Sequence, residues 1–355
     1  MTFLHNENCG SSLQAWALQE TLRNLGYEPY GLDWRPDRKE QVRNLLASGN
    51  SPAVVLDSMR RRKARGERNT AGFERFNREK LSLSPACRDR AALRREAGSC
   101  RLLLCGSDQV WSPEWLNSAY FLDFAEGQPR IAYACSLGVS AQPGARKGRK
   151  IARLVRPFAA VSVREEEGRA VLERLLPDKT VDVMPDPVML VPGERWHEMC
   201  GSPETRRTLV CYFLRDQESA WQAAEELAAR EKLTLLPLAV TNEGRRRSGA
   251  LCNPDPLQWL RTMASAGRVI TDSFHGAAMA ALLGKPLTVV RRWRDGDPAS
   301  KNSRIDQLMR LAGWTEDSAC LPSARVEERL SEQRMKGTAW LSAALEQALK
   351  SIGQR

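Results

Sequence analysis

The sequence is poor in residues that bind transition metals. It has three histidines in 355 residues, at positions 5, 197 and 275, and none of its nine cysteines forms a CxxC pair. An odd cysteine count and runs such as Leu102-Leu103-Leu104-Cys105 favour reduced, mostly buried thiols over disulfides or zinc ligands. We therefore expect no metal site and no disulfide framework.

Long apolar runs are also missing. A membrane-spanning helix needs about 20 consecutive apolar residues, and no apolar stretch of the sequence approaches that length. Residues 1–9 have neither the basic start nor the apolar core of a secretory leader. We therefore expect a cytoplasmic protein.

The charge of the chain indicates anionic partners. The formal net charge is +11, which suits nucleic acid, a membrane surface or phosphorylated small molecules. No zinc-finger spacing, RNP-like aromatic pattern or heptad accompanies the basic segments, so we expect no nucleic acid partner. The charge-dense segment 58–68 is either a solvated face or a contact for an anionic acceptor or membrane.

Short apolar strands alternate with helices along most of the chain, which predicts an α/β fold with two doubly wound domains facing a cleft. We expect a first domain at 1–195 and a second at 205–355, with a linker that begins at Pro192-Gly193. The amphipathic tail at 323–350 could pack back on the first domain. The expected strands are 2–5, 27–34, 101–105, 131–138, 159–164, 181–183, 208–214, 233–239, 268–271 and 287–290, and the expected helices include 13–25, a basic one at 145–157, 220–231, 256–266 and 302–312.

One strand-to-helix turn stands out, Thr271-Asp272-Ser273-Phe274-His275-Gly276. Asp272 or Ser273 can cap the following helix, and His275 then lies in its first turn, where free N–H groups and the helix dipole favour an anion. A titratable imidazole there suits acid–base chemistry. The alternative is that His275 only caps or packs.

Two further strand ends carry polar residues. Asp108 and Gln109 follow the strand at 101–105 and can hydrogen-bond a sugar, with Trp111 stacking on its ring; a capping Asp and a core Trp are the alternative. Arg164 ends the strand at 159–164, where a guanidinium can hold phosphate or carboxylate through two bonds. Its alternative role is a salt bridge to the neighbouring glutamates.

Four ordered segments resemble the polysaccharide pyruvyl transferase family. They are Asn8-Cys9-Gly10-Ser11-Ser12-Leu13-Gln14-Ala15-Trp16-Ala17-Leu18, Gly106-Ser107-Asp108-Gln109-Val110-Trp111, Ser162-Val163-Arg164-Glu165-Glu166-Glu167-Gly168 and Thr271-Asp272-Ser273-Phe274-His275-Gly276. Residues 120–124 and 303–305 also resemble family segments. Cys9 departs from the family's usual aromatic residue, and Ser112 departs from its usual Asn.

The resemblance implies a fold similar to GT-B glycosyltransferases and transfer of pyruvate from phosphoenolpyruvate to a saccharide as a ketal, without a cofactor. The acceptor would belong to a bacterial cell-surface polysaccharide or its lipid-linked precursor, which allows peripheral association with the inner face of the membrane. A nucleotide-sugar glycosyltransferase and a non-enzymatic basic polymer-binding protein are the alternatives. In this interpretation His275 is the acid/base, and the substrate-binding residues are Arg164, Ser273, Phe274, Gly276, Asp108, Gln109, Arg304, Arg291 and Arg292.

Overall fold

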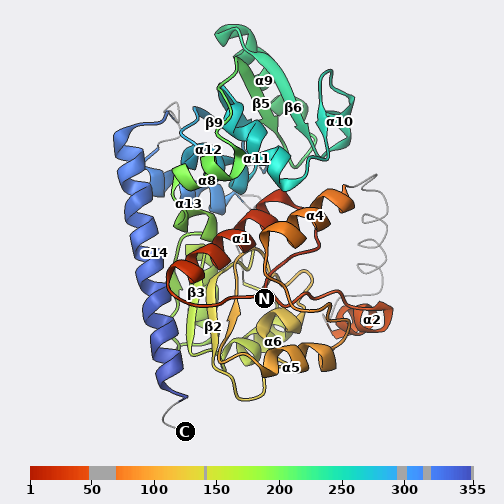
Figure 1. Ribbon diagram of the computed structural model, residues 1–355, viewed down its shortest axis with the longest axis vertical. Coiled ribbons are helices and arrows are strands. Elements are labelled where there is room, and N and C mark those ends of the chain that lie inside the picture. The colour runs from red at the N-terminus through yellow and green to blue at the C-terminus, as the bar shows by residue number, and fades with distance from the viewer. Residues whose placement is uncertain (48–68, 140–141, 294–301, 315–320, 353–355) are drawn as a thin grey trace.

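Two parallel β-sheets organise the computed structural model, which describes residues 1–47, 69–139, 142–293, 302–314 and 321–352. The first sheet has the order β1-β2-β3-β4 and the second the order β7-β6-β5-β8-β9. They occupy the lower and upper halves of the molecule in Figure 1. Parallel sheets are normally buried on both faces, and both sheets here follow that rule.

Helices cover both faces of the first sheet, which consists of β1 (Leu103–Cys105), β2 (Arg130–Cys135), β3 (Ala160–Val163) and β4 (Asp182–Val183). Side chains alternate along a strand. Ile131 and Tyr133 pack with residues of α1 (Cys9–Asn24) and α14 (Ala324–Lys350). Ala132 packs on the opposite face with residues of α6 (Ala145–Val155) and α7 (Glu166–Leu175).

The second sheet is built in the same way and contains a change in strand order. Its strands are β5 (Thr208–Tyr212), β6 (Thr234–Ala239), β7 (Leu251–Cys252), β8 (Arg268–Thr271) and β9 (Leu287–Val289). The chain winds outward from β5 through β6 to β7, then returns to place β8 on the other side of β5. In open α/β sheets ligands bind beyond the carboxyl ends of the strands at such a switch point.

Helices pack on both faces of this sheet as well. α9 (Glu218–Glu231) covers the face of Leu209 and Ile270, whereas α11 (Pro256–Ser265) and α12 (Phe274–Leu282) cover the face of Val210 and Val269. The predicted α/β class with two doubly wound sheets is confirmed.

The long helix α14 contacts both halves of the chain. Its first turns pack with α13 (Ser303–Ala312) through Val326 and Leu330. Further along, Leu341 is fully buried against the first sheet and Trp340 Nε1 donates a hydrogen bond to Asp182 Oδ2 at 2.7 Å. Figure 1 shows α14 running along the side of both halves.

Several expectations about local structure are wrong. Residues 2–5 form no strand, and 27–34 contributes only isolated bridges, Gly31 to Leu83 and Trp34 to Cys87, because these extended segments lack a continuous partner. The expected linker after Pro192 is instead helix α8 (Gly193–Cys200), anchored by the buried Trp196. The elements not yet placed are α2 (Arg38–Ala47), α4 (Thr70–Lys80), α5 (Arg90–Gly98), η1 (Ser118–Phe121), η2 (Pro187–Leu190) and α10 (Asn242–Arg246).

Most cysteines whose environment is described lie in the core of the protein. Cys9, Cys87, Cys105, Cys135, Cys200 and Cys211 are buried, as expected for core thiols. The charge-dense segment 58–68 lies outside the described residues. Among the helices that are described, none is long and apolar enough to cross a membrane.

Candidate functional site

His275 lies in the first turn of α12, beyond the carboxyl end of β8. Ser273 caps this helix, and its Oγ accepts from the amide of Gly276 at 3.4 Å. Thr271 Oγ1 accepts from the amide of Ser273 at 3.1 Å. Gly276 has no room for a side chain, because a Cβ would lie 2.6 Å from Thr271 Oγ1. The turn is thus held by its own hydrogen bonds, and His275 is 8% exposed.

Asp186 connects the two halves of the chain at this point. It caps η2 after β4, and its Oδ1 accepts from the amide of Val188 at 3.1 Å. Its Oδ2 accepts a 3.0 Å hydrogen bond from Ser107 Oγ, forms an ion pair with Arg164 Nη1 and lies 3.6 Å from His275 Nε2. Burial by itself would raise the pKa of Asp186. The positive charge of Arg164 and the contact with His275 lower it by more than burial raises it, so the net pKa is well below its ordinary value. Asp186 is therefore a buried carboxylate anion.

Arg164 extends from the end of β3 toward the second half of the chain. It is buried, with Nε 3.5 Å from Glu165 Oε1 and Cζ 4.6 Å from the centre of the Phe274 ring. Burial lowers the pKa of Arg164, but Asp186 and Glu165 raise it to a net value above the ordinary one. Its Nε and Nη2 have no hydrogen-bond partner within the described residues. A charged fork with two unused donors can bind an anionic ligand.

The start of α1 closes over His275. A Cβ at Gly10 would lie 2.2 Å from His275 Nδ1, so only glycine permits this approach. The next residue, Ser11, donates from Oγ to Asp108 Oδ2. Asp108 has a φ of +76°, the left-handed region that an L-residue adopts at a cost. In this state the Asp108 carboxylate is therefore hydrogen-bonded to Ser11 of α1.

The other predicted arginines occupy different surroundings. Arg304, at the start of α13, has a buried Nε without an acceptor among the described residues. Burial lowers the pKa of Arg304 to about 10, and the nearby charge of Arg164 contributes. Arg292 instead binds the site turn, with Nη2 2.7 Å from the carbonyl oxygen of Asp272. Arg291 forms an ion pair with Asp306 at 3.2 Å.

The predicted sugar contacts at 108–111 have mixed outcomes. Trp111 is fully buried and stacks on Phe121 with ring centres 5.1 Å apart, so the interpretation of Trp111 as a sugar platform is wrong; it belongs to the core. Gln109 is half-buried, and Gly138 packs so closely that a Cβ there would lie 2.5 Å from Gln109 Nε2. The binding roles of Asp108 and Gln109 remain predictions.

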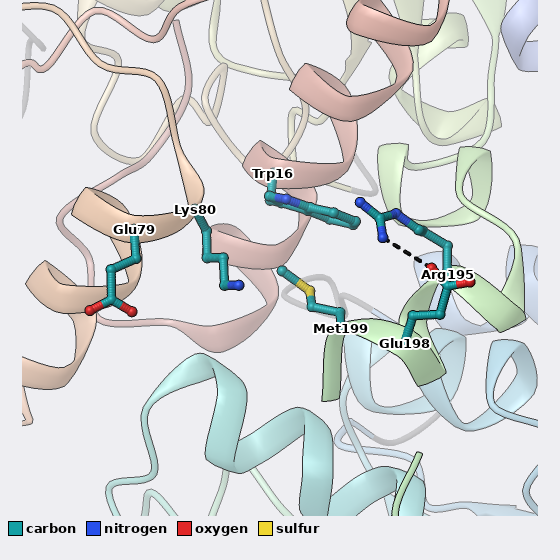
Figure 2. A pocket seen from close by; sticks show the side chains of 6 residues that line it. All are labelled: Trp16, Glu79, Lys80, Arg195, Glu198 and Met199. Carbon is teal, nitrogen blue, oxygen red and sulfur yellow. Dashed lines mark hydrogen bonds and ion pairs between the residues drawn. The ribbon is translucent and has the colours of Figure 1, made fainter. Parts of the chain in front are cut away.

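A separate surface pocket of about 310 Å³ lies along α1, α4 and α8. Figure 2 shows Trp16, Lys80 and Met199 around it. Trp16 is only 5% exposed, because Trp196 and the Arg195 guanidinium pack against its ring. The pocket therefore offers little aromatic surface for stacking, and none of its lining residues belongs to the cluster around Asp186.

Sequence reasoning missed the residues that join the predicted ones. Asp186 is not among the residues predicted from the sequence, although a carboxylate between two prolines after the strand at 181–183 was the available signal. Gly10 and Ser11 lie in the first family-like segment, but no role is predicted for them, because contacts between distant segments leave no local pattern. In the described part of the chain, no group of three or more His, Cys, Asp or Glu side chains is placed to hold a metal ion.

The fold and this cluster define a two-domain α/β protein whose charged site lies between the halves, at the carboxyl ends of parallel strands. The sequence model of the polysaccharide pyruvyl transferase family matches residues 8–294. The chain therefore belongs to the polysaccharide pyruvyl transferase family. A comparison with curated proteins found no match.

Solved structures with similar folds share little sequence with this chain. The UDP-GlcNAc 2-epimerase from Neisseria meningitidis, bound to UDP-GlcNAc, is 11% identical, with a TM-score of 0.47 over 93% of this chain and 98% of its own. The spinosyn forosaminyltransferase SpnP is 13% identical, with a TM-score of 0.41 over 98% of this chain and 92% of its own. A putative UDP-N-acetylglucosamine 2-epimerase from Listeria monocytogenes is 10% identical, with a TM-score of 0.42 over 89% of this chain and 95% of its own. Likenesses this distant say nothing about substrate.

Proposed function

We propose that this protein transfers a pyruvyl group from phosphoenolpyruvate to a saccharide and forms a pyruvate ketal. The observation that carries the proposal is the meeting of Arg164 and His275 at Asp186, because these two residues come from different halves of the chain. One is a permanent cation with unused donors, and the other is an imidazole whose Nε2 has no hydrogen-bond partner within the described residues. The family membership supports transfer to a polysaccharide.

The reaction needs an acid/base and an anion site. Protonation of the methylene carbon of phosphoenolpyruvate makes its C2 electrophilic; two acceptor hydroxyls add there, each losing its proton, and inorganic phosphate leaves. Of the two protons released from the hydroxyls, one makes up for the proton given to carbon and the other leaves with the phosphate, so the acid/base must both donate and accept. An imidazole does this near neutral pH. We assign that role to His275.

Arg164 and Arg304 would hold the donor. Phosphoenolpyruvate carries a carboxylate and a phosphate, and a planar guanidinium binds either through two parallel hydrogen bonds. The amides of Phe274 and His275, at the start of α12, are not used by the two hydrogen bonds that hold the turn. Anions favour such a helix start. Ser273 and Gly276 would act by shaping this turn, since their polar groups already bond to each other.

Asp108 and Gln109 are assigned to the acceptor side. Ser11 binds Asp108 in this state, so a hydroxyl of the sugar would replace the serine hydroxyl when the acceptor enters. A lipid-linked precursor as acceptor would bring the enzyme to the inner face of the membrane. No cofactor or metal is needed for the proposed chemistry.

The decisive experiment measures inorganic phosphate released from phosphoenolpyruvate in the presence of saccharide acceptors. Arg164→Lys should raise the KM for phosphoenolpyruvate at least about tenfold, because lysine keeps the charge but loses the planar fork. Arg169→Lys is the matched control, since Arg169 is exposed on α7 and forms ion pairs there with Glu166 and Glu173. Release of a nucleoside diphosphate from a sugar nucleotide, without phosphate release from phosphoenolpyruvate, would replace this proposal with a glycosyltransferase. Binding of a saccharide polymer with neither reaction would indicate a non-enzymatic binding protein.

A further inference from the structure

Residues 127–164 contain no aspartate or glutamate but eight lysines and arginines. Helix α6 (Ala145–Val155) lies at the centre of this segment and carries most of that charge. It belongs to the first half of the molecule, in the lower part of Figure 1. None of the roles proposed above uses it.

Burial fixes which face of α6 meets solvent. Gly148, Ile151, Leu154 and Val155 are buried, and a Cβ at Gly148 would lie 3.0 Å from Leu175 of α7. The apolar side of α6 is therefore taken up by the protein core. Its opposite side is held outward as part of a rigid surface.

Four arginines form one line on the outward face. Arg146, Arg149, Arg153 and Arg156 are all exposed. Their spacing of three, four and three residues places them on the same side of a helix, along about 15 Å of its axis. We call these four residues the arginine row.

No carboxylate neutralises the arginine row within the described residues, which record no ion pair for any of its members. Of the acidic groups on the flanking elements, three are paired with arginines outside the row, and the Oε2 of Glu167 on α7 is buried without a hydrogen-bond partner among the described residues. Asp123, which follows η1, is bound by Arg90, and Glu166 and Glu173 of α7 are bound by Arg169. An unneutralised line of charge costs repulsion energy, so a functional partner of opposite charge is a physical reason to keep it.

We infer that the arginine row is the surface by which this protein docks on a membrane that contains anionic phospholipids. A line of guanidinium groups on a flat, rigid helix matches an array of phosphate headgroups, and the buried apolar side of α6 means that docking occurs without insertion. The other exposed residues beside the row are Gln142, Gly144, Ala145, Pro157 and Ala159, and none of them offers an aromatic ring on which a base could stack. A nucleic acid partner is therefore less well matched.

The position of α6 relates this surface to the site. The helix follows β2, so its first turn lies toward the carboxyl end of the sheet, where Ser136 Oγ donates to Glu165 Oε1 at 2.5 Å beside Arg164. Docking through the row would hold that edge near a lipid-linked acceptor. This last step rests on the proposed function, but the docking surface itself does not.

The test is co-sedimentation with phosphatidylcholine vesicles prepared with and without phosphatidylglycerol. We expect the wild-type chain to bind only the anionic vesicles, with binding that weakens as salt is raised. The variant R146Q/R149Q/R153Q/R156Q should lose at least about tenfold in affinity, since each cation near an anionic surface contributes separately. The matched control is R206Q/R207Q/R230Q/R246Q, which removes the same charge from exposed positions of the second half and should bind within about twofold of wild type.

Several results would overturn this inference. The first is an equal loss of vesicle affinity in both quadruple variants. The second and third are equal binding of the wild-type chain to neutral and anionic vesicles, and no binding of the wild-type chain to either. The fourth is an arginine-row variant that loses binding to RNA but keeps binding to vesicles. Circular dichroism of both variants checks that they are folded. Phosphate release with a water-soluble saccharide should be unchanged in the arginine-row variant. If vesicle binding holds but phosphoenolpyruvate is never consumed, the docking surface stands and the proposed function fails.

Discussion

His275 Nε2 lies 3.6 Å from Asp186 Oδ2, and the two residues come from opposite halves of the chain. The same carboxylate oxygen also forms an ion pair with Arg164 Nη1 and accepts a hydrogen bond from Ser107 Oγ. One buried anion therefore positions the proposed acid/base and the proposed donor-binding cation together.

His275→Ala should abolish most pyruvyl transfer without unfolding the protein. General acid–base catalysis contributes about 10²- to 10⁴-fold, so kcat should fall by that order. Phosphate release from phosphoenolpyruvate is the measurement. His197→Ala is the control, because His197 lies half-buried on α8 and outside the cluster. A fully active His275→Ala variant would show that this imidazole only packs.

Asp186→Asn should destabilise the fold in a pH-dependent way. At pH 7 the variant leaves the buried Arg164 without its closest anion, and breaking a buried pair costs about 3 kcal/mol of unfolding free energy. The pKa of Asp186 is lower in the folded protein than its ordinary 3.8, so its ionised form stabilises the fold above 3.8. That contribution is lost as the pH falls from there toward the lower folded value.

The difference in unfolding free energy between wild type and Asp186→Asn should therefore shrink below about pH 4. Urea titrations at pH 7 and in this acidic range measure it. Asp178→Asn, at an exposed position, should be nearly neutral at both. A loss of the same size at both pH values would argue against an ionised Asp186.

Gly10→Ala should impair both stability and turnover. The added Cβ would lie 2.2 Å from His275 Nδ1, so α1 or the imidazole must move. Overpacking of this kind costs about 1–3 kcal/mol. Thermal unfolding and phosphate release measure the two effects. Gly98→Ala adds the same methyl at the end of α5, where no atom beyond the adjacent residues and the local helix backbone lies within 4 Å. It should leave turnover unchanged and stability unchanged or slightly raised, since alanine is a better helix former than glycine.

Leu341→Ala should reveal how much α14 contributes to stability. Leu341 is fully buried against the first sheet, and truncation of such a leucine costs about 2–5 kcal/mol. Met335→Ala on the same helix should cost little, because Met335 is 63% exposed. Denaturant unfolding compares the two. Equal effects would mean that α14 does not pack as described.

The sequence alone determined the parts of this protein that follow from local periodicity. Alternating apolar strands and amphipathic helices predicted the α/β class, most strands of both sheets and the helices that follow them, since hydrophobic period and capping residues act over a few positions. The ordered motifs also identified the family and placed Arg164, Asp108 and His275 at strand ends.

The contacts between distant residues follow from the tertiary structure and not from any local pattern. Gly10, Asp186 and His275 are separated by more than 80 residues at each step, and no local pattern records that they touch. For the same reason the sequence leaves both a sugar-stacking ring and a core tryptophan open for Trp111, and its packing with Phe121 and Phe158 decides for the core. Segments 2–5 and 27–34 have strand-like composition but lack a continuous partner, and a strand exists only through hydrogen bonds to a neighbour.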